Sequence, residues 1–511
     1  MFINELSQRI KAWRGDSSTF VEVPLSKRSI SRTEAYKQIF RLAALVKPNA
    51  ISGKTTVGFC FEDPVNWILA TIAAQVAGAI AVPIPREFTE SQISSFIPHL
   101  DLVFTDSHRA AVKFSSLLGK ASKIEVKEFN GLVLHLITGE ATQSSRLSLP
   151  SSAVGVIHTS GSTDNPKGVV ISEDGLWSVL LSMTERLAPI GNVRYASVLP
   201  MSLLLEQILG IYIPLFSGGK VAVLPSTIPC YTGTQPDLEP YLATIKESRA
   251  NFSMVPPSFL AELTNRSAAS TLSPRDQLGN KLQVLATGGA PIEYSTLQFL
   301  HESGLEVFQG YGLSENTSVV AWTYPGPNAI GSVGRPLKHN EVRINDGQIE
   351  VRGGSVFLGY VSRGEFSLKD EPWLKTGDNG FFDDEGCLHI TGRDSNLIVL
   401  SSGRNVSPEW VEGKFKSIPS IKEILLIGHG RPFLSALVLV NKGFECSEAL
   451  RAVRRCADEI ESDLPEFSRV QAFRTLPFEN SYYSVSGRVL RKQVIEKHKD
   501  VIDEIYSSIK G

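Results

Sequence analysis

The feature that most constrains the fold of this chain is a layout that recurs over its first two-thirds. Short apolar runs end in glycine, serine, threonine or other turn residues, and longer amphipathic segments separate them. Apolar strands that alternate with helical segments are typical of mostly parallel sheets with helices on both faces. We therefore predict an α/β fold with ligands at the carboxyl ends of the strands, where the small residues gather. The expected strands include residues 55–62, 79–85, 102–106, 154–160, 196–202, 219–225 and 282–289.

The pattern of apolar runs and turn residues along the 511-residue chain changes twice, which indicates more than one domain. From residue 331 to about residue 385, short runs with glycine turns predict a small β-rich lobe. After Arg393 the chain mixes apolar strands with charged helical segments, as in a compact α+β domain. We therefore divide the chain into a large domain, residues 1–393, and a small domain, residues 394–511.

The composition excludes several classes of protein. A formal net charge of −2 without a dominant basic stripe gives no indication of nucleic-acid binding. Five scattered cysteines lack metal-ligand spacing, which indicates unpaired thiols in a reducing compartment such as the cytoplasm. Residues 1–15 lack the apolar run of a secretory signal. The most apolar stretch, residues 67–83, is short and rich in alanine, so we interpret it as a buried helix and strand and not as a membrane span.

The strongest local signal is the segment His-Thr-Ser-Gly-Ser-Thr-Asp-Asn-Pro-Lys-Gly-Val at residues 158–169. Its hydroxyl and backbone N–H groups can surround phosphate oxygens, and Lys167 supplies positive charge. It is not a Walker A loop, because Pro166 precedes the lysine and no serine or threonine ends the motif. On composition alone, a phosphate loop and a flexible surface turn are equally good interpretations.

Later segments add further groups that a bound nucleotide needs. Residues 308–315 run from an apolar strand into glycines, so Tyr311 can stack on a base and Glu315 can hold Mg²⁺ between phosphates. Asp378 is suited to accept hydrogen bonds from a ribose diol, and Arg393 offers a fork of donors to ribose or phosphate. Each residue alone also fits a structural role, but their order along one chain favours nucleotide binding.

With these motifs in this order, the sequence resembles the adenylate-forming superfamily. That superfamily includes acyl-CoA synthetases, firefly luciferase and the adenylation domains of peptide synthetases. The resemblance spans about residues 31–492. It rests on residues 159–163 with 166–168, 288–291, 310–312 with Glu315, 331–336, 376–378, 392–393 and 402–412.

The resemblance implies two half-reactions. In the first, the carboxylate of a small-molecule acid attacks the α-phosphate of ATP and gives acyl-AMP and pyrophosphate. In the second, a thiol of coenzyme A or of a separate acyl carrier protein takes the acyl group. The resemblance also implies that the small domain is mobile and rotates about a hinge between the two steps.

By the same resemblance, the site residues fall into a catalytic group and an ATP-binding group. Thr163 and Glu315 act on the Mg²⁺–phosphate assembly, Tyr311 and Gly289 flank adenine, and Asp378 and Arg393 hold the ribose. The catalytic group is Thr163, Lys167, Glu315 and Arg488. The ATP-binding group is Thr159, Ser160, Gly161, Ser162, Gly289, Ala290, Tyr311, Gly312, Ser314, Asp378 and Arg393.

Three positions depart from the family pattern. Arg488 stands where the family has a lysine that bridges the carboxylate and the α-phosphate, and a planar guanidinium does not replace a compact ammonium at a tight site. Asp164 replaces a glycine of the phosphate loop, and Leu203 stands where many relatives have histidine or an aromatic residue. These departures indicate a specialised reaction in which the first step is slowed, altered or lost.

The acid is expected to be fatty or aromatic and not an α-amino acid. No aspartate occurs in residues 201–207, where peptide-synthetase relatives grip an α-amino group, and the expected pocket segments are mostly apolar. Coenzyme A is the default acceptor. Two alternatives stay open: a divergent ligase that uses an amine or another small nucleophile, and a catalytically retired nucleotide- or acyl-binding protein.

Overall fold

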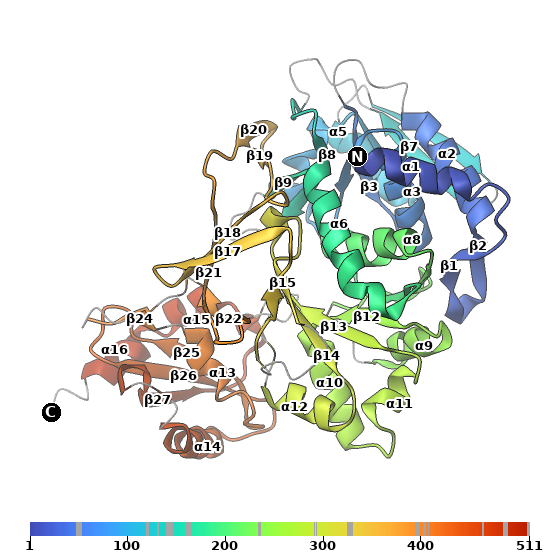
Figure 1. Cartoon of the computed structure of the whole chain (residues 1–511). Coiled ribbons are helices and arrows are strands. Elements are labelled where there is room, and N and C mark those ends of the chain that lie inside the picture. Colours follow the sequence, from blue (N-terminus) through green and yellow to red (C-terminus); the bar gives the residue numbers. More distant parts are fainter. Residues whose placement is uncertain are drawn as a thin grey trace.

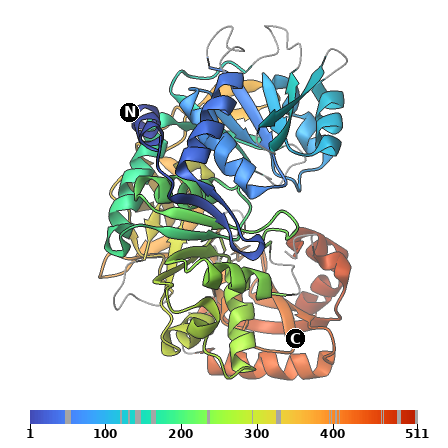
Figure 2. The same ribbon diagram turned by 90° about the vertical axis from the view of Figure 1, so that its right-hand side faces the viewer.

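The computed structural model confirms the α/β fold, with two nine-stranded sheets, smaller sheets, and helices packed around and between them (Figures 1 and 2). It describes residues 1–46, 54–118, 122–129, 132–138, 147–159, 166–232, 237–290, 292, 294–323, 331–393, 396, 398–401, 405–406, 408–461, 464, 466–483 and 489–507.

The first large sheet has the order β16-β15-β14-β13-β12-β10-β11-β1-β2. Its parallel strands are β1 (Thr19–Val23), β10 (Arg194–Ser197), β11 (Lys220–Val223), β12 (Phe252–Val255), β13 (Val284–Gly288) and β14 (Val307–Tyr311). The antiparallel strands at its edges are β2 (Arg28–Ser31), β15 (Ala321–Trp322) and β16 (Arg335–Pro336). Phe259, Leu263 and Leu300 of the helices pack against Leu285 of the sheet in a shared core. The helices that flank this part are α9 (Glu239–Glu247), α10 (Pro257–Ala268), α11 (Pro274–Leu278) and α12 (Tyr294–Glu302).

The second large sheet has the order β20-β19-β9-β8-β4-β3-β5-β7-β6. Its parallel strands are β3 (Thr56–Cys60), β4 (Ile80–Pro83), β5 (Leu102–Thr105) and β8 (Ala153–Thr159). Its antiparallel strands are β6 (Lys123–Phe129), β7 (Leu132–Thr138), β9 (Lys167–Ser172), β19 (Gly359–Ser362) and β20 (Glu365–Leu368). The short α4 (Glu90–Ser94) and α5 (His108–Leu118) belong to the same part of the chain.

One hydrophobic core includes buried residues of both large sheets and of the helices between them. These helices are α1 (Phe2–Ala12), α2 (Arg32–Val46), α3 (Pro64–Val76) and α6 (Glu173–Leu187), with α7 (Leu204–Gln207), a π-helical turn (Ile208–Tyr212) and α8 (Ile213–Phe216). Helix α3 is buried on every side, since twelve of its residues are buried, and most of them are apolar, as expected from residues 67–83. No helix in the described ranges has the length and hydropathy needed to cross a bilayer.

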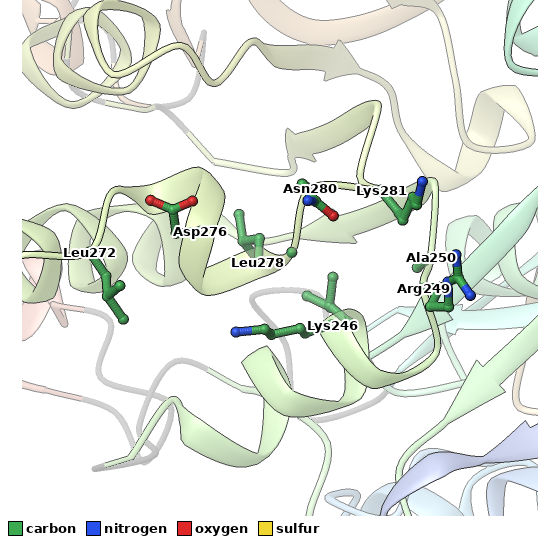
Figure 3. Close-up of a pocket in the computed structure, with 10 residues that line it drawn as sticks. Lys246, Arg249, Ala250, Leu272, Asp276, Leu278, Asn280 and Lys281 are labelled. Carbon is green, nitrogen blue, oxygen red and sulfur yellow. The ribbon is translucent and has the colours of Figure 1, made fainter.

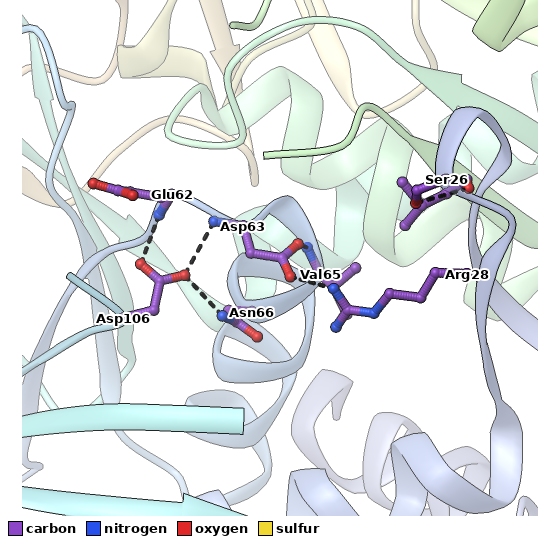
Figure 4. Close-up of polar contacts among 8 residues, drawn as sticks. Ser26, Arg28, Glu62, Asp63, Val65, Asn66 and Asp106 are labelled. Atoms are coloured by element: carbon purple, nitrogen blue, oxygen red, sulfur yellow. Dashed lines mark hydrogen bonds and ion pairs between the residues drawn. The ribbon is translucent and has the colours of Figure 1, made fainter. Parts of the chain in front are cut away.

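The start of α3 is fixed by carboxylates (Figure 4). Asp63 caps the helix and accepts a hydrogen bond of 3.0 Å from the backbone N–H of Val65. Asp106, just after β5, accepts from the backbone N–H of Asp63 at 3.0 Å and from the Asn66 amide at 2.8 Å. Arg28 of β2 reaches Asp63 at 2.6 Å, so this ion pair joins the two large sheets.

The β-rich lobe forms a four-stranded sheet of β17 (Asn340–Asn345), β18 (Gln348–Gly353), β21 (Leu374–Phe382) and β22 (Leu388–Arg393). One part of the expected lobe lies elsewhere, because the hairpin β19–β20 pairs with β9 of the second large sheet. That pairing gives the buried strand β9 a partner on its second side, which an edge strand would lack.

The carboxyl-terminal part has a three-stranded sheet of β25 (Ile421–Ile427), β26 (Leu434–Val440) and β27 (Val470–Leu476). Its helices are α13 (Pro408–Gly413), α14 (Cys446–Glu459), α15 (Arg491–Lys497) and α16 (Lys499–Ser507), and β23 (Ile398–Val399) pairs with β24 (Asn405–Val406). The two core clusters of this part contain only residues between Ile398 and Tyr506. The apolar strands β25 and β26 and the charged helix α14 agree with the α+β composition expected after Arg393.

Candidate active site

The two ends of the expected phosphate loop lie side by side. Strand β8 ends at Thr159 and β9 begins at Lys167, and these residues are partners in the antiparallel pairing. His158 is buried and stacks on Phe96 with ring centroids 3.8 Å apart. Burial lowers the pKa of His158 to about 3, so the ring is neutral and adds no charge beside the loop. Ser160, Gly161, Ser162, Thr163 and Asp164 lie outside the described residues.

Glu315 and Lys167 both contact Tyr360. The Tyr360 hydroxyl donates a hydrogen bond of 2.9 Å to Glu315 Oε1, and Lys167 Nζ lies 5.6 Å from the centroid of the Tyr360 ring. The backbone N–H of Phe357 also donates to the Glu315 carbonyl at 2.8 Å. Burial and the Glu315 charge raise the pKa of Tyr360, which keeps its hydroxyl protonated as a donor. Sequence reasoning missed Tyr360, because its pairing across β9 has no local signal.

The turn that carries Glu315 depends on Gly312. A Cβ at Gly312 would lie 1.5 Å from the Ser318 carbonyl oxygen, so no larger residue fits there. Ser314, Glu315 and Asn316 then form a short 3₁₀ helix directly after β14. The expected site residues Gly312, Ser314 and Glu315 therefore lie together at the carboxyl end of a parallel strand.

The expected adenine-binding residues lie at two adjacent strand ends. Gly288, the last residue of β13, is paired with Gly310 of β14, so Gly289 and Tyr311 extend past the same edge of the sheet. Gly289 has a φ of +78°, which favours glycine, and Gly289 and Ala290 are exposed. This exposed edge leaves the backbone open to a flat ligand.

Asp378, Arg393 and Tyr311 form one hydrogen-bonded group. The Arg393 guanidinium contacts Asp378 Oδ1 at 2.7 Å, and the Tyr311 hydroxyl donates to Asp378 Oδ2 at 2.7 Å. Asp378 is 5% exposed, and burial raises the pKa of its carboxyl above the usual value. The negative charges of Glu409 and Glu315 also raise this pKa, whereas Tyr311 and Arg393 oppose the change. The structure therefore brings together the two residues expected at a ribose.

A buried acid lies beside the expected acyl pocket, and sequence reasoning missed it. Glu206 is 0% exposed, and the hydroxyl oxygens of Tyr195 and Ser197 lie 2.8 and 2.5 Å from its carboxylate oxygens. Burial raises the pKa of Glu206 to about 8, so the group is mostly protonated at neutral pH. Its only sequence signal is that it is the one charged residue in the apolar run 203–216. Leu203, at the start of α7, is exposed.

No group of three or more His, Cys, Asp or Glu side chains within the described ranges forms a metal cluster. Among the described residues, Glu315 is the carboxylate that shares the neighbour Tyr360 with Lys167. This arrangement fits Mg²⁺, which in nucleotide sites takes one or two protein carboxylates and completes its coordination with phosphate oxygens and water.

The expected catalytic residue Arg488 lies outside the described residues. Just after it, Arg491 pairs with Glu412 at 2.6 Å and donates to the Leu426 carbonyl at 2.8 Å. Lys492 lines a depression of about 540 Å³ in the carboxyl-terminal part, together with Arg431. None of the five cysteines, all of which lie in the described ranges, forms a disulfide.

Comparison with known proteins shows which family the chain resembles. The chain matches the AMP-binding enzyme family over residues 10–361 and the AMP-binding enzyme C-terminal domain over residues 395–510. It is 31% identical over 260 residues to the long-chain-fatty-acid–CoA ligase FadD15 of Mycobacterium bovis, which covers 46% of this chain and 43% of that protein. The 2-succinylbenzoate–CoA ligase of Bacillus pumilus is 30% identical over 291 residues, covering 53% of this chain and 55% of that one. The chain thus spans about half the length of these two relatives.

The fold also matches solved structures over almost the whole chain. The ATP-bound structure of MatB from Rhodopseudomonas palustris has a TM-score of 0.75 at 20% sequence identity, covering 98% of this chain and 100% of that one. The family match spans well over half of the residues and includes Lys167, Tyr311 and Glu315. This chain belongs to the AMP-binding enzyme family.

Proposed function

We propose that this protein uses ATP to activate a carboxylic acid as acyl-AMP and then transfers the acyl group to the thiol of coenzyme A. The observation that carries the proposal is that Lys167 and Glu315 both contact Tyr360, as described above. A cationic group, Lys167, suits the phosphates of ATP, and an anionic group, Glu315, suits the metal ion bound to them. The Asp378–Arg393 pair at 2.7 Å supports a ribose site nearby.

In the first half-reaction, a carboxylate oxygen of the acid forms a bond to the α-phosphorus of ATP. The bond from this phosphorus to the bridging oxygen breaks, and pyrophosphate leaves. Lys167 stabilises the charge on the β- and γ-phosphates, and fixed donors at a preformed site lower the barrier because they need no rearrangement. We assign the same task to the backbone and hydroxyl groups of Thr159, Ser160, Gly161, Ser162 and Thr163.

The nucleoside is held by groups at the neighbouring strand ends. Asp378 accepts hydrogen bonds from the ribose hydroxyls, and Arg393 donates to them. Gly289 and Tyr311 bracket adenine, with Ala290, Gly312 and Ser314 beside them. Fixing ATP in this way turns the attack of the acid into a reaction between two aligned groups.

Glu315 and Thr163 would hold Mg²⁺ at this site. When bound, the ion neutralises charge on the phosphate oxygens. Tyr360 keeps the Glu315 carboxylate in one orientation through its hydrogen bond of 2.9 Å.

In the second half-reaction, the sulfur of coenzyme A forms a bond to the acyl carbon. The bond from that carbon to the AMP oxygen breaks, AMP leaves, and the thiol proton passes to solvent. We propose that residues 394–511 form a mobile domain that rotates after Arg393 between the two steps. Arg488 then serves in the first step in place of the family lysine.

The acid is proposed to be fatty or aromatic. Glu206 is neutral at pH 7 and already lies against Tyr195 and Ser197, so it offers no charge to an α-ammonium group. Leu204 and Ile208 on the same helical run are buried and apolar.

An acyl carrier protein could take the place of coenzyme A as the acceptor, because its thiol would react with the acyl-AMP in the same way. Cysteines that form no disulfide agree with a cytoplasmic location.

The test is pyrophosphate release from ATP and Mg²⁺ with a panel of fatty, aromatic and amino acids, first without and then with coenzyme A. We expect release that depends on one class of acid, and acyl-CoA only when coenzyme A is present. Pyrophosphate release without acyl-CoA formation would point to another acceptor. Absence of release across the panel, with ATP binding confirmed by calorimetry, would contradict the proposal and favour a retired enzyme.

A further inference from the structure

Cationic side chains gather at the edge of the first large sheet where its parallel strands begin. Arg194 and Lys220 are the first residues of β10 and β11, and Arg249 and Lys281 lie shortly before β12 and β13. These four residues line a depression of about 320 Å³. This edge is opposite the strand ends that carry Gly289 and Tyr311, so the group is separate from the candidate active site.

A second depression, of about 420 Å³, shares Arg249 and Lys281 with the first (Figure 3). Lys246, near the end of α9, and the exposed Leu272 line it as well. We call the two depressions together the basic depression. Its walls therefore combine cationic groups with an apolar side chain.

The acids near the basic depression are already engaged. Glu22 pairs with Lys220 at 2.6 Å. Asp276, the acid that lines the second depression, accepts a hydrogen bond of 2.7 Å from the Ser273 hydroxyl in the cap of α11. In the part of the chain that the structure describes, Lys246, Arg249 and Lys281 have no carboxylate partner.

Two of the cations are also held close together. Arg194 Nε donates a hydrogen bond of 2.9 Å to the carbonyl oxygen of Arg249, which brings the two arginines side by side. The contact holds the Arg194 side chain against the backbone of Arg249, in the wall of the same depression.

The backbone at Arg249 gives an independent reason to examine this residue. The N–H groups of Arg249 and Ala250 donate to Lys246 and Ile245 carbonyls and close α9. Arg249 has a φ of +54°, the left-handed conformation in which a helix usually ends with glycine. The fold therefore favours glycine at this position, so the backbone does not explain the arginine.

We propose that the basic depression binds a phosphate-bearing anion at a site separate from the nucleotide site. The guanidinium of Arg249 and the ammonium group of Lys281, which lie at the same end of the depression in Figure 3, are donors of the kind that phosphate oxygens prefer. Leu272 gives an apolar surface for the organic part of the ligand. The phosphate belongs either to a free small molecule or to the headgroup of an anionic lipid.

The test measures the thermal unfolding midpoint of the full chain with inorganic phosphate and with glycerol 3-phosphate, against sodium chloride at equal ionic strength. We expect a rise of about 2 °C for a free ligand at saturation. In parallel, sedimentation with vesicles of phosphatidylcholine, with and without phosphatidylglycerol, measures binding to a lipid headgroup.

The variant Arg249→Gly removes the charge and suits the backbone, so it is expected to fold. Arg249→Gly should abolish the rise in the unfolding midpoint that phosphate causes. Lys281→Ser should weaken phosphate binding about tenfold. Arg363→Gly is the matched control, since Arg363 is an exposed arginine at φ +49° in the turn between β19 and β20. Lys167→Ala should keep the response, which separates it from phosphate binding at the candidate active site.

A response to free phosphates that Arg249→Gly abolishes supports a small-molecule site. Sedimentation that requires phosphatidylglycerol and is lost in Arg249→Gly supports a lipid headgroup. The proposal is overturned if neither probe acts, or if Arg249→Gly and Arg363→Gly respond equally.

Discussion

Tyr360 donates a hydrogen bond of 2.9 Å to Glu315, although the two residues reach each other from different sheets. Tyr360 lies on β19 of the second large sheet, and Glu315 follows β14 of the first. Val361, the residue after Tyr360, is paired in the sheet with Gly168, and Gly168 is next to Lys167. The hairpin β19–β20 is therefore a direct link between the lysine and the carboxylate that border the proposed phosphate site.

We predict that Tyr360→Phe lowers kcat/KM for ATP about tenfold or more. The lost hydrogen bond is made to a charged group, and such bonds contribute about 1.5–3 kcal/mol. The apparent affinity for Mg²⁺ in calorimetry with ATP should weaken, while the unfolding midpoint changes little. Tyr294→Phe, on the exposed face of α12, serves as the control. Unchanged Mg²⁺ dependence in Tyr360→Phe would refute a positioning role.

Asp378→Asn is expected to raise KM for ATP at least tenfold, because the ribose then loses a charged acceptor. Asp383→Asn is a matched control in the same lobe, where Asp383 accepts from His389 at 2.8 Å. Steady-state kinetics with pyrophosphate detection measures both variants. Equal effects of the two substitutions would mean that Asp378 acts only through the stability of the lobe.

Glu206→Gln should change how stability depends on pH. The pKa of Glu206 is raised to about 8 in the folded chain from 4.5 without burial, so between these values the folded state binds more protons than the unfolded state. The wild-type protein therefore loses stability as pH rises through this window, by about 1.4 kcal/mol per pH unit at most. Glutamine has no proton to lose, so the variant should gain stability relative to wild type from pH 5 to pH 8. Denaturant unfolding across this range measures the difference, and parallel curves would contradict it.

Arg488→Lys is expected to increase the rate of pyrophosphate release, since a compact ammonium can approach both the carboxylate and the α-phosphate. Single-turnover measurement with radiolabelled ATP isolates this step from transfer to coenzyme A. A fall in rate would instead mean that the arginine is fitted to the reaction of this particular enzyme.

Local sequence patterns predicted the parts of the fold that depend on local chemistry. The uniformly apolar run at residues 67–83 became α3 and β4, and the small residues at the ends of apolar strands became the edge that carries Gly289 and Glu315. These features follow from periodicity and from turn residues, which a single sequence contains. The pairing of Asp378 with Arg393 follows from the hairpin of β21 and β22, which is also local.

Long-range pairing was not visible in the sequence. Tyr360 meets β9 across about 190 residues of chain, and nothing near Tyr360 specifies that partner. The burial of Glu206 depends on Tyr195 and Ser197 of β10, so its protonation follows from packing and not from its neighbours in sequence. When contacts between distant segments determine the role of a residue, that role can be recognised only from the structure.

The core clusters in the described ranges do not cross the link after Arg393: those of the carboxyl-terminal part begin at Ile398. A segment that supplies its own buried side chains can be exchanged for that of a relative without leaving cavities in the remainder. Recombination between related genes can therefore join the portion before this link to a different carboxyl-terminal portion. The two portions of the chain are thus free to evolve at different rates.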